Sequence, residues 1–103
     1  MYKLEFLPIA KKDIDDIIYY ISNSLKNKVA AKNMADSFIA GAKSILEFPL
    51  GAPVCKTEKK LEKEYRSIRI KNFIMFYTIN ENEKIISIVR VVYQKMNINN
   101  ILE

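Results

Sequence analysis

The sequence of 103 residues contains no histidine and a single cysteine, Cys55. The absence of histidine removes the commonest general base at neutral pH, the commonest nitrogen ligand for metals and any Ser–His or Cys–His pair. A lone cysteine excludes a disulfide framework and fits a reducing compartment. No GxGxxG or P-loop pattern of nucleotide-binding motifs occurs. We therefore expect no cofactor and no metal site.

Long apolar runs are also missing. No stretch approaches the roughly 18 apolar residues of a membrane span, and the N-terminus shows no charged and then apolar leader that ends in small residues. Only two glycines and three prolines occur, so long disordered linkers are not expected. We interpret the chain as one domain, residues 1–103, of a cytoplasmic protein with no membrane partner.

The charge is unevenly distributed along the chain. The formal net charge is +5, from 17 lysines and arginines against 12 acidic residues. Residues 1–53 carry 7 basic and 6 acidic side chains, whereas residues 54–103 carry 10 basic and 6 acidic ones, so the positive excess lies in the second half. This excess is either ordinary solubilising charge or a surface that attracts nucleic acid or an acidic protein segment.

The first half of the chain predicts a short strand and two helices. Residues 2–6 alternate apolar and polar side chains, which is typical of a half-buried strand. Pro8 then suits the first turn of a helix. This helix should end around residues 22–25, and its buried face comprises Ala10, Ile14, Ile17, Ile18, Ile21 and Leu25. After a polar break at residues 26–28, a second helix is expected over residues 29–47, where Gly41 allows close approach to a neighbour and Pro49 prevents continuation.

The second half predicts three consecutive strands after an exposed loop at residues 50–64. Residues 65–70, 73–79 and 85–93 are rich in isoleucine, valine and aromatic residues. Lys71-Asn72 and residues 80–83 provide the turns between them. The apolar tail residues Ile98, Ile101 and Leu102 can pack back onto the sheet. The fold class is therefore α+β in the order β-α-α-β-β-β, with a helical hairpin packed on one face of a mainly antiparallel sheet.

The strands and the following tail provide one group of residues that could bind a target. Cations bind phosphate, arginine does so bidentately, and tyrosine can stack on bases. Alternation along a strand means that the whole group cannot face one way, and each arginine could instead reach solvent or pair with a carboxylate. Cleavage of a phosphodiester would also need a general base, for which Glu64 and Tyr93 are the nearest substitutes for histidine. The target-binding candidates are Arg66, Arg69, Lys71, Arg90, Tyr93 and Lys95.

Five segments together resemble the RelE/ParE superfamily of type II toxin–antitoxin toxins along nearly the whole chain. They are YKLEFLPIAKKDIDDIIYYI, the Ala30-Ala31 pair, EFP at 47–49, EYRSIRIKNFIMFYTI and IVRVVYQKMNINNIL. The resemblance implies the same β-α-α-β-β-β fold. It also implies a cognate antitoxin that wraps the helical hairpin and the sheet in a hetero-oligomer, and a basic toxin suits an acidic wrapping chain.

The resemblance also bears on the target, because RelE-like members cut mRNA on the ribosome whereas ParE-like members inhibit DNA gyrase. RelE-like nucleases place an arginine where this chain has Ile74, a cation near Gln94 and a late tyrosine near Asn100. The ending is similar to the ParE pattern, with Asn97 in place of an aspartate. The resemblance therefore favours a ParE-like gyrase toxin without catalysis. The alternatives are a RelE-like ribosome-dependent mRNA endonuclease that uses Arg66, Arg69, Arg90, Tyr93 and Lys95, or a degenerate member that binds its antitoxin without toxicity.

Overall fold

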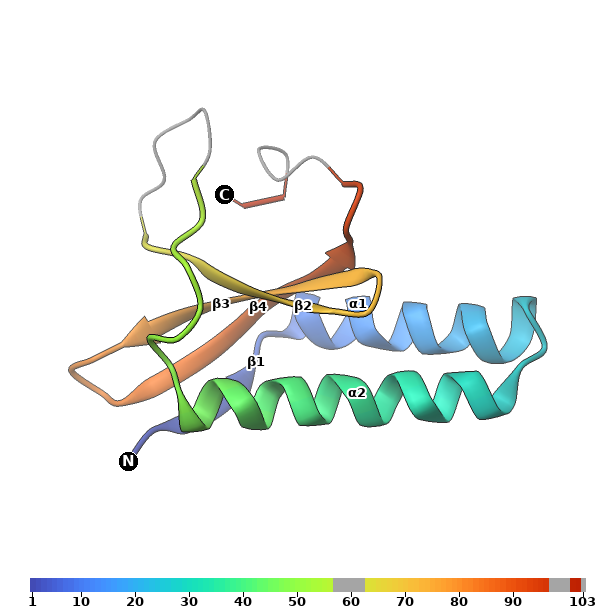
Figure 1. Cartoon of the computed structure of the whole chain (residues 1–103), viewed down its shortest axis with the longest axis horizontal. Helices are drawn as coiled ribbons and strands as arrows, with labels where there is room; N and C mark the ends of the chain where they lie inside the picture. Colours follow the sequence, from blue (N-terminus) through green and yellow to red (C-terminus); the bar gives the residue numbers. More distant parts are fainter. Residues whose placement is uncertain (57–62, 97–100, 103) are drawn as a thin grey trace.

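The computed structural model describes residues 1–56, 63–96 and 101–102. Two helices lie on one side of a four-stranded sheet (Figure 1), and the predicted α+β fold in the order β-α-α-β-β-β is confirmed. The elements in chain order are β1 (Lys3–Phe6), α1 (Pro8–Tyr19), the π-helical turn η1 (Tyr20–Ser24), α2 (Lys28–Glu47), β2 (Arg66–Ile70), β3 (Phe73–Asn80) and β4 (Ile85–Tyr93). No helix in this part of the chain is both long enough and apolar enough to cross a membrane.

The sheet has the strand order β1-β4-β3-β2. The three C-terminal strands form an antiparallel meander, and β1 adds to its β4 edge in the parallel direction. Ile88 pairs with Tyr77 whereas Arg90 pairs with Phe76, so Val89 is the extra residue of a β-bulge in β4. A bulge bends its strand and re-aims the neighbouring side chains.

Local chemistry explains where the helices begin and end. Pro8 occupies the first turn of α1, where its missing N–H costs no hydrogen bond. The side chain of Asn27 caps α2 by accepting a 2.9 Å hydrogen bond from the N–H of Ala30. Gly41 lets α2 approach the sheet closely, because a Cβ there would lie 2.4 Å from Cδ1 of Ile70.

The first helical segment ends at Ser24, within the predicted residues 22–25, but the burial of Leu25 differs from the prediction. The continuous helical pattern placed Leu25 on the buried face, but its side chain is 57% exposed. Leu25 follows η1, whose wider turn holds one residue more than an α-helical turn of 3.6 residues and so rotates everything after it by about 100°. The other predicted residues of this face do pack in the core.

Apolar side chains fill both faces of the sheet. The larger cluster lies between the sheet and the helices and includes Met75, Tyr77, Ile86 and Ile88, which are fully buried. The smaller cluster lies on the opposite face and includes Leu102, so the expected packing of the tail is confirmed for this residue. The expectations for Ile98, Asn97 and Asn100 concern positions outside the described residues.

Most described residues of the loop after α2 are exposed, as predicted, but part of this loop packs against the sheet. Ala52 is buried, and Val54 forms an isolated antiparallel bridge with Arg66. The N–H of Cys55 donates a 2.7 Å hydrogen bond to the carbonyl of Tyr65. The start of β2 is therefore covered by the loop that precedes it, whereas residues 57–62 are outside the described ranges.

Candidate functional site

An apolar groove of about 510 Å³ lies between the helical hairpin and the β2–β3 turn. We call it the hairpin groove. Its floor includes Phe73, whose ring makes edge-to-face contacts with Phe38 at 5.8 Å and with Tyr93 at 6.1 Å. These contacts hold the partly exposed Tyr93 ring at the groove wall. The full lining is Asp16, Ile17, Tyr20, Ile21, Leu25, Met34, Lys71, Asn72, Phe73 and Tyr93.

Lys71 places a positive charge at the rim of the hairpin groove. It has a left-handed backbone conformation with φ of 54° in the β2–β3 turn, and its side chain is exposed. No carboxylate among the described residues forms an ion pair with it. An apolar groove with one unpaired cation at its rim fits an amphipathic segment that carries an acidic residue.

A second groove, of about 580 Å³, lies on the other side of the same turn. We call it the outer groove. It brings together three positions that the sequence singled out, Arg69, Ile74 and Gln94. The Nε of Arg69 donates a 3.1 Å hydrogen bond to the carbonyl of Lys71, and the N–H of Gln94 donates to the carbonyl of Asn72 at 2.9 Å. The remaining lining residues are Gly51, Ala52, Pro53, Ser67 and Ile68.

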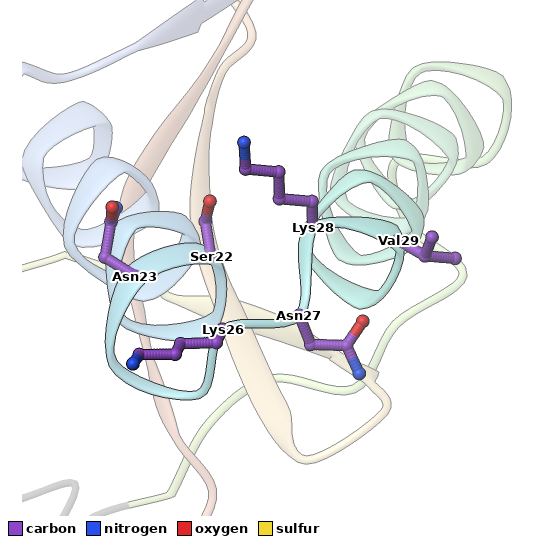
Figure 2. Close-up of a pocket in the computed structure, with 6 residues that line it drawn as sticks. All are labelled: Ser22, Asn23, Lys26, Asn27, Lys28 and Val29. Carbon is purple, nitrogen blue, oxygen red and sulfur yellow. The ribbon is translucent and has the colours of Figure 1, made fainter.

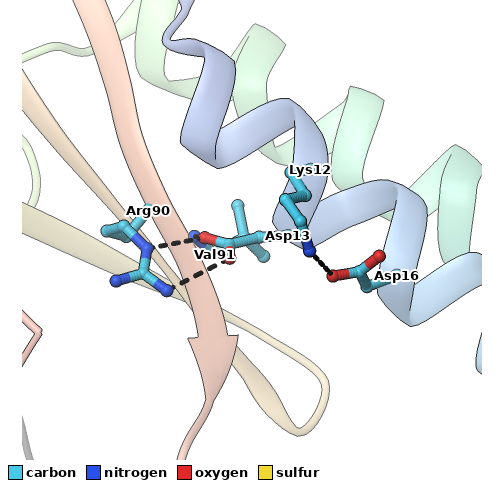
Figure 3. A network of polar contacts seen from close by, with 5 residues as sticks. All are labelled: Lys12, Asp13, Asp16, Arg90 and Val91. Carbon is cyan, nitrogen blue, oxygen red and sulfur yellow. Dashed lines mark hydrogen bonds and ion pairs between the residues drawn. The ribbon is translucent and has the colours of Figure 1, made fainter.

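Arg90 points away from both grooves, toward helix α1. Its guanidinium donates to the Asp13 carboxylate through Nε at 2.8 Å and through Nη2 at 3.1 Å (Figure 3). The same carboxylate accepts a 3.0 Å hydrogen bond from the N–H of Val91. The side-chain hydrogen bond from Arg90 to Asp13 is also the main reason why the pKa of Arg90 is raised. Arg90 is therefore held by an internal partner.

The position of Asp13 follows from the length of β1. The last residue pair between β1 and β4 is Phe6 with Ile88, so β4 continues beyond the end of its neighbour. Helix α1 starts two residues later and places Asp13 beside the uncovered edge of β4. A carboxylate can satisfy both a strand N–H and a guanidinium, and this arrangement fastens α1 to β4.

Arg66 is also engaged within the molecule. Its Nη1 donates a 2.6 Å hydrogen bond to the carbonyl of Ala52, and its Nη2 forms a 3.0 Å ion pair with Glu64. Only 16% of the Arg66 side chain is exposed. Glu64, the carboxylate considered as a general base, is thus already paired with the Arg66 guanidinium. Cys55 is an unsuitable nucleophile, because burial raises the pKa of its thiol.

The six predicted residues therefore do not form one site. Lys71 and Tyr93 line the hairpin groove and Arg69 lines the outer groove, whereas Arg66 and Arg90 have internal partners and Lys95 is exposed after β4. Sequence reasoning did not identify Asp13 or the groove-lining role of Tyr20 and Leu25. For Asp13 a signal existed, since an aspartate three residues after Ala10 and four before Ile17 lies on the apolar stripe.

A polar pocket of about 570 Å³ occupies the tip of the helical hairpin. It is lined by Ser22, Asn23, Lys26, Asn27, Lys28 and Val29. Figure 2 shows the side chains of Lys26 and Lys28 pointing in different directions. The side-chain carbonyl of Asn27 already accepts the hydrogen bond that caps α2. The pocket thus lacks the converging cations of an anion site. Within residues 1–56, 63–96 and 101–102, no three His, Cys, Asp or Glu side chains lie together as a metal-binding group.

Solved structures with the same fold come from toxin–antitoxin systems. The chromosomal ParDE system from P. aeruginosa matches with a TM-score of 0.72 and 17% identity, over 90% of this chain and 96% of that chain. The RelBE2 complex from Mycobacterium tuberculosis matches with a TM-score of 0.61 and 17% identity, over 89% and 90% of the two chains. The archaeal RelE–RelB complex from Pyrococcus horikoshii OT3 matches with a TM-score of 0.59 and 14% identity, over 93% of this chain and 98% of that chain. No curated protein sequence gives a significant match.

The family assignment rests on sequence. The model of the family described as the ParE toxin of the type II toxin–antitoxin system ParDE matches residues 4–98. This range includes nearly all of β1, both helices and the complete meander of β2, β3 and β4. The chain therefore belongs to the ParE toxin family and is a ParE-like toxin of a type II toxin–antitoxin system.

Proposed function

We propose that this toxin arrests growth by binding and poisoning DNA gyrase, without catalysis of its own, in the cytoplasm. The main support is the separation of its cations. A nuclease centre needs several cations and a base around one phosphate, but the guanidinium of Arg90 is held by Asp13 and that of Arg66 by Glu64 and Ala52. Among the described residues, the outer groove offers a single arginine, Arg69, beside the Ser67 hydroxyl and otherwise apolar and amide side chains.

We further propose that the cognate antitoxin occupies the hairpin groove. The groove walls are mainly aliphatic and aromatic, which fits the apolar face of an amphipathic helix. An acidic residue on that helix would meet Lys71 at the rim, and the net charge of +5 would speed the capture of an acidic chain. The antitoxin and the toxin would then form a hetero-oligomer, as the similar toxin–antitoxin complexes do.

A second candidate function is a ribosome-dependent mRNA endonuclease. The outer groove supports it, because Arg69 and the hydroxyl of Ser67 line a space large enough for a nucleotide. In that case the outer groove would hold the scissile phosphate, and Arg69 would be its principal cation. Tyr93 and Lys95 would have to act from outside this groove.

Assays with purified toxin separate the two candidates. Gyrase poisoning predicts inhibition of DNA supercoiling and gyrase-linked DNA breaks, with no mRNA cleavage on translating ribosomes. Site-specific mRNA cleavage that is lost in Arg69→Ala would establish the nuclease and refute the gyrase proposal. Lys84→Ala is a matched control, because Lys84 is an exposed cation in the β3–β4 turn, away from both grooves. Absence of growth arrest in cells that lack the antitoxin would indicate a member without toxicity.

A further inference from the structure

The π-helical turn η1 gives the hairpin groove one of its walls. The N–H of Leu25 donates to the carbonyl of Tyr20, five residues earlier, at 3.0 Å, and the N–H of Asn27 donates to the carbonyl of Ile21 at 3.1 Å. π-Helical turns occur frequently at functional sites, and this one ends the first helical segment. Tyr20, Ile21 and Leu25 all line the groove, so the wide turn and the groove wall are the same piece of chain.

A side chain within η1 adds a hydrogen bond to the wide turn. The side-chain amide of Asn23 donates to the carbonyl of Tyr19, four residues earlier, at 3.2 Å. The segment contains neither glycine nor proline, the usual causes of helix distortion. The Asn23 side chain therefore reinforces a turn that the backbone bonds of Leu25 and Asn27 also hold.

The wide turn moves Leu25 from the core to the groove. In a regular helix Leu25 would continue the apolar stripe of Ile14, Ile18 and Ile21 and would be buried. Instead it is 57% exposed at the groove rim, beside Tyr20, which is 56% exposed. Leaving a leucine this exposed forgoes burial that would stabilise the monomer, and a partner helix in the groove would recover that burial.

We propose that η1, reinforced by Asn23, is the specificity-determining element of the hairpin groove, because it presents Tyr20 and Leu25 to the apolar face of the antitoxin helix. This inference rests on the proposed antitoxin site. It predicts that stability and binding respond in opposite directions when η1 is converted into a regular helix. A purely structural role for η1 would make both fall together.

The test removes Asn23 by deletion, which takes out one residue and restores the α-helical register. We expect the melting temperature of the toxin to stay the same or rise, because Leu25 becomes buried. Affinity for the cognate antitoxin, measured by calorimetry, should fall by about tenfold or more. Asn33→Ala is the matched control, since Asn33 is an exposed asparagine on α2 that does not line the groove.

A second variant keeps the inference testable if the deletion fails to fold. Leu25→Ala removes an exposed side chain, so folding should be unaffected while antitoxin affinity falls by about fivefold or more. Affinity within about twofold of the wild type in Leu25→Ala, or in a folded Asn23 deletion, overturns the inference. Failure of the wild-type toxin to bind its antitoxin would instead refute the proposed function.

Discussion

Replacement of Arg90 by alanine should reduce stability much more than it changes the target-binding surface. The variant removes two hydrogen bonds to Asp13 and leaves that carboxylate, among the described residues, with the N–H of Val91 as its hydrogen-bond partner. The side chains of Arg90 and Asp13 are only 24% and 15% exposed, so the pair lies between an exposed and a buried ion pair.

The exposure sets the expected magnitude. Loss of one partner costs about 3–5 kcal/mol in a buried pair and about 0–1 kcal/mol in an exposed one. The partial exposure of Arg90 and Asp13 therefore places the cost of Arg90→Ala at about 2–3 kcal/mol. In a protein of this size, such a loss lowers the melting temperature by roughly 10–20 °C.

Urea denaturation of four proteins tests this expectation. The proteins are the wild type, Arg90→Ala, Asp13→Ala and the double variant. The double variant should lose about 1–2 kcal/mol less unfolding free energy than the two single variants lose together. Lys12→Ala is the control, because its ion pair with Asp16 is exposed on the same helix (Figure 3) and its loss should change the free energy of unfolding little. Additive losses would refute the proposed coupling. Unchanged stability with lost gyrase inhibition would show that Arg90 contacts the target.

Three further predictions concern stability. Gly41→Ala should destabilise the protein by about 1–3 kcal/mol in urea denaturation, although alanine favours helix, because the new Cβ would lie 2.4 Å from Ile70; a more stable variant would contradict this packing. Tyr77→Phe should cost about 1–2 kcal/mol in the same assay, since it leaves a main-chain carbonyl without the 2.6 Å hydrogen bond from the Tyr77 hydroxyl, and an unchanged midpoint would argue against that bond. The hydrogen bond from Tyr2 lowers the pKa of Glu81, so its stabilising contribution is present above the ordinary Glu pKa and is lost as pH falls through the lower folded value. Tyr2→Phe should therefore weaken the pH dependence of the melting temperature below the ordinary Glu pKa, and an identical pH profile would contradict the pairing.

The candidate site was only partly predictable from the sequence. Arg69, Lys71 and Tyr93 do line grooves around the β2–β3 turn. Arg90 was a target-binding candidate, with pairing to a carboxylate as the alternative, and the sequence could not identify Asp13 because it lies 77 residues away in the chain. A local pattern shows that an arginine occurs in a strand, but it does not show which distant carboxylate reaches it.

The sequence by itself determined the order of the elements and the faces that they bury. Hydrophobic periodicity is local, so the alternation in residues 2–6 and the helical spacing from Ala10 to Ile21 could be interpreted without a structure. Pro8, Pro49 and the polar break at residues 26–28 marked the helix ends for the same reason.

Only the tertiary structure decided how these elements meet. The parallel pairing of β1 with β4 and the capture of Arg90 by Asp13 join segments that are far apart in sequence. The exposure of Leu25 was decided by the wide turn η1, which an apolar pattern of helical spacing does not reveal. In each case the deciding hydrogen bonds or packing contacts are properties of the folded arrangement, so the grooves exist only once the hairpin lies against the sheet.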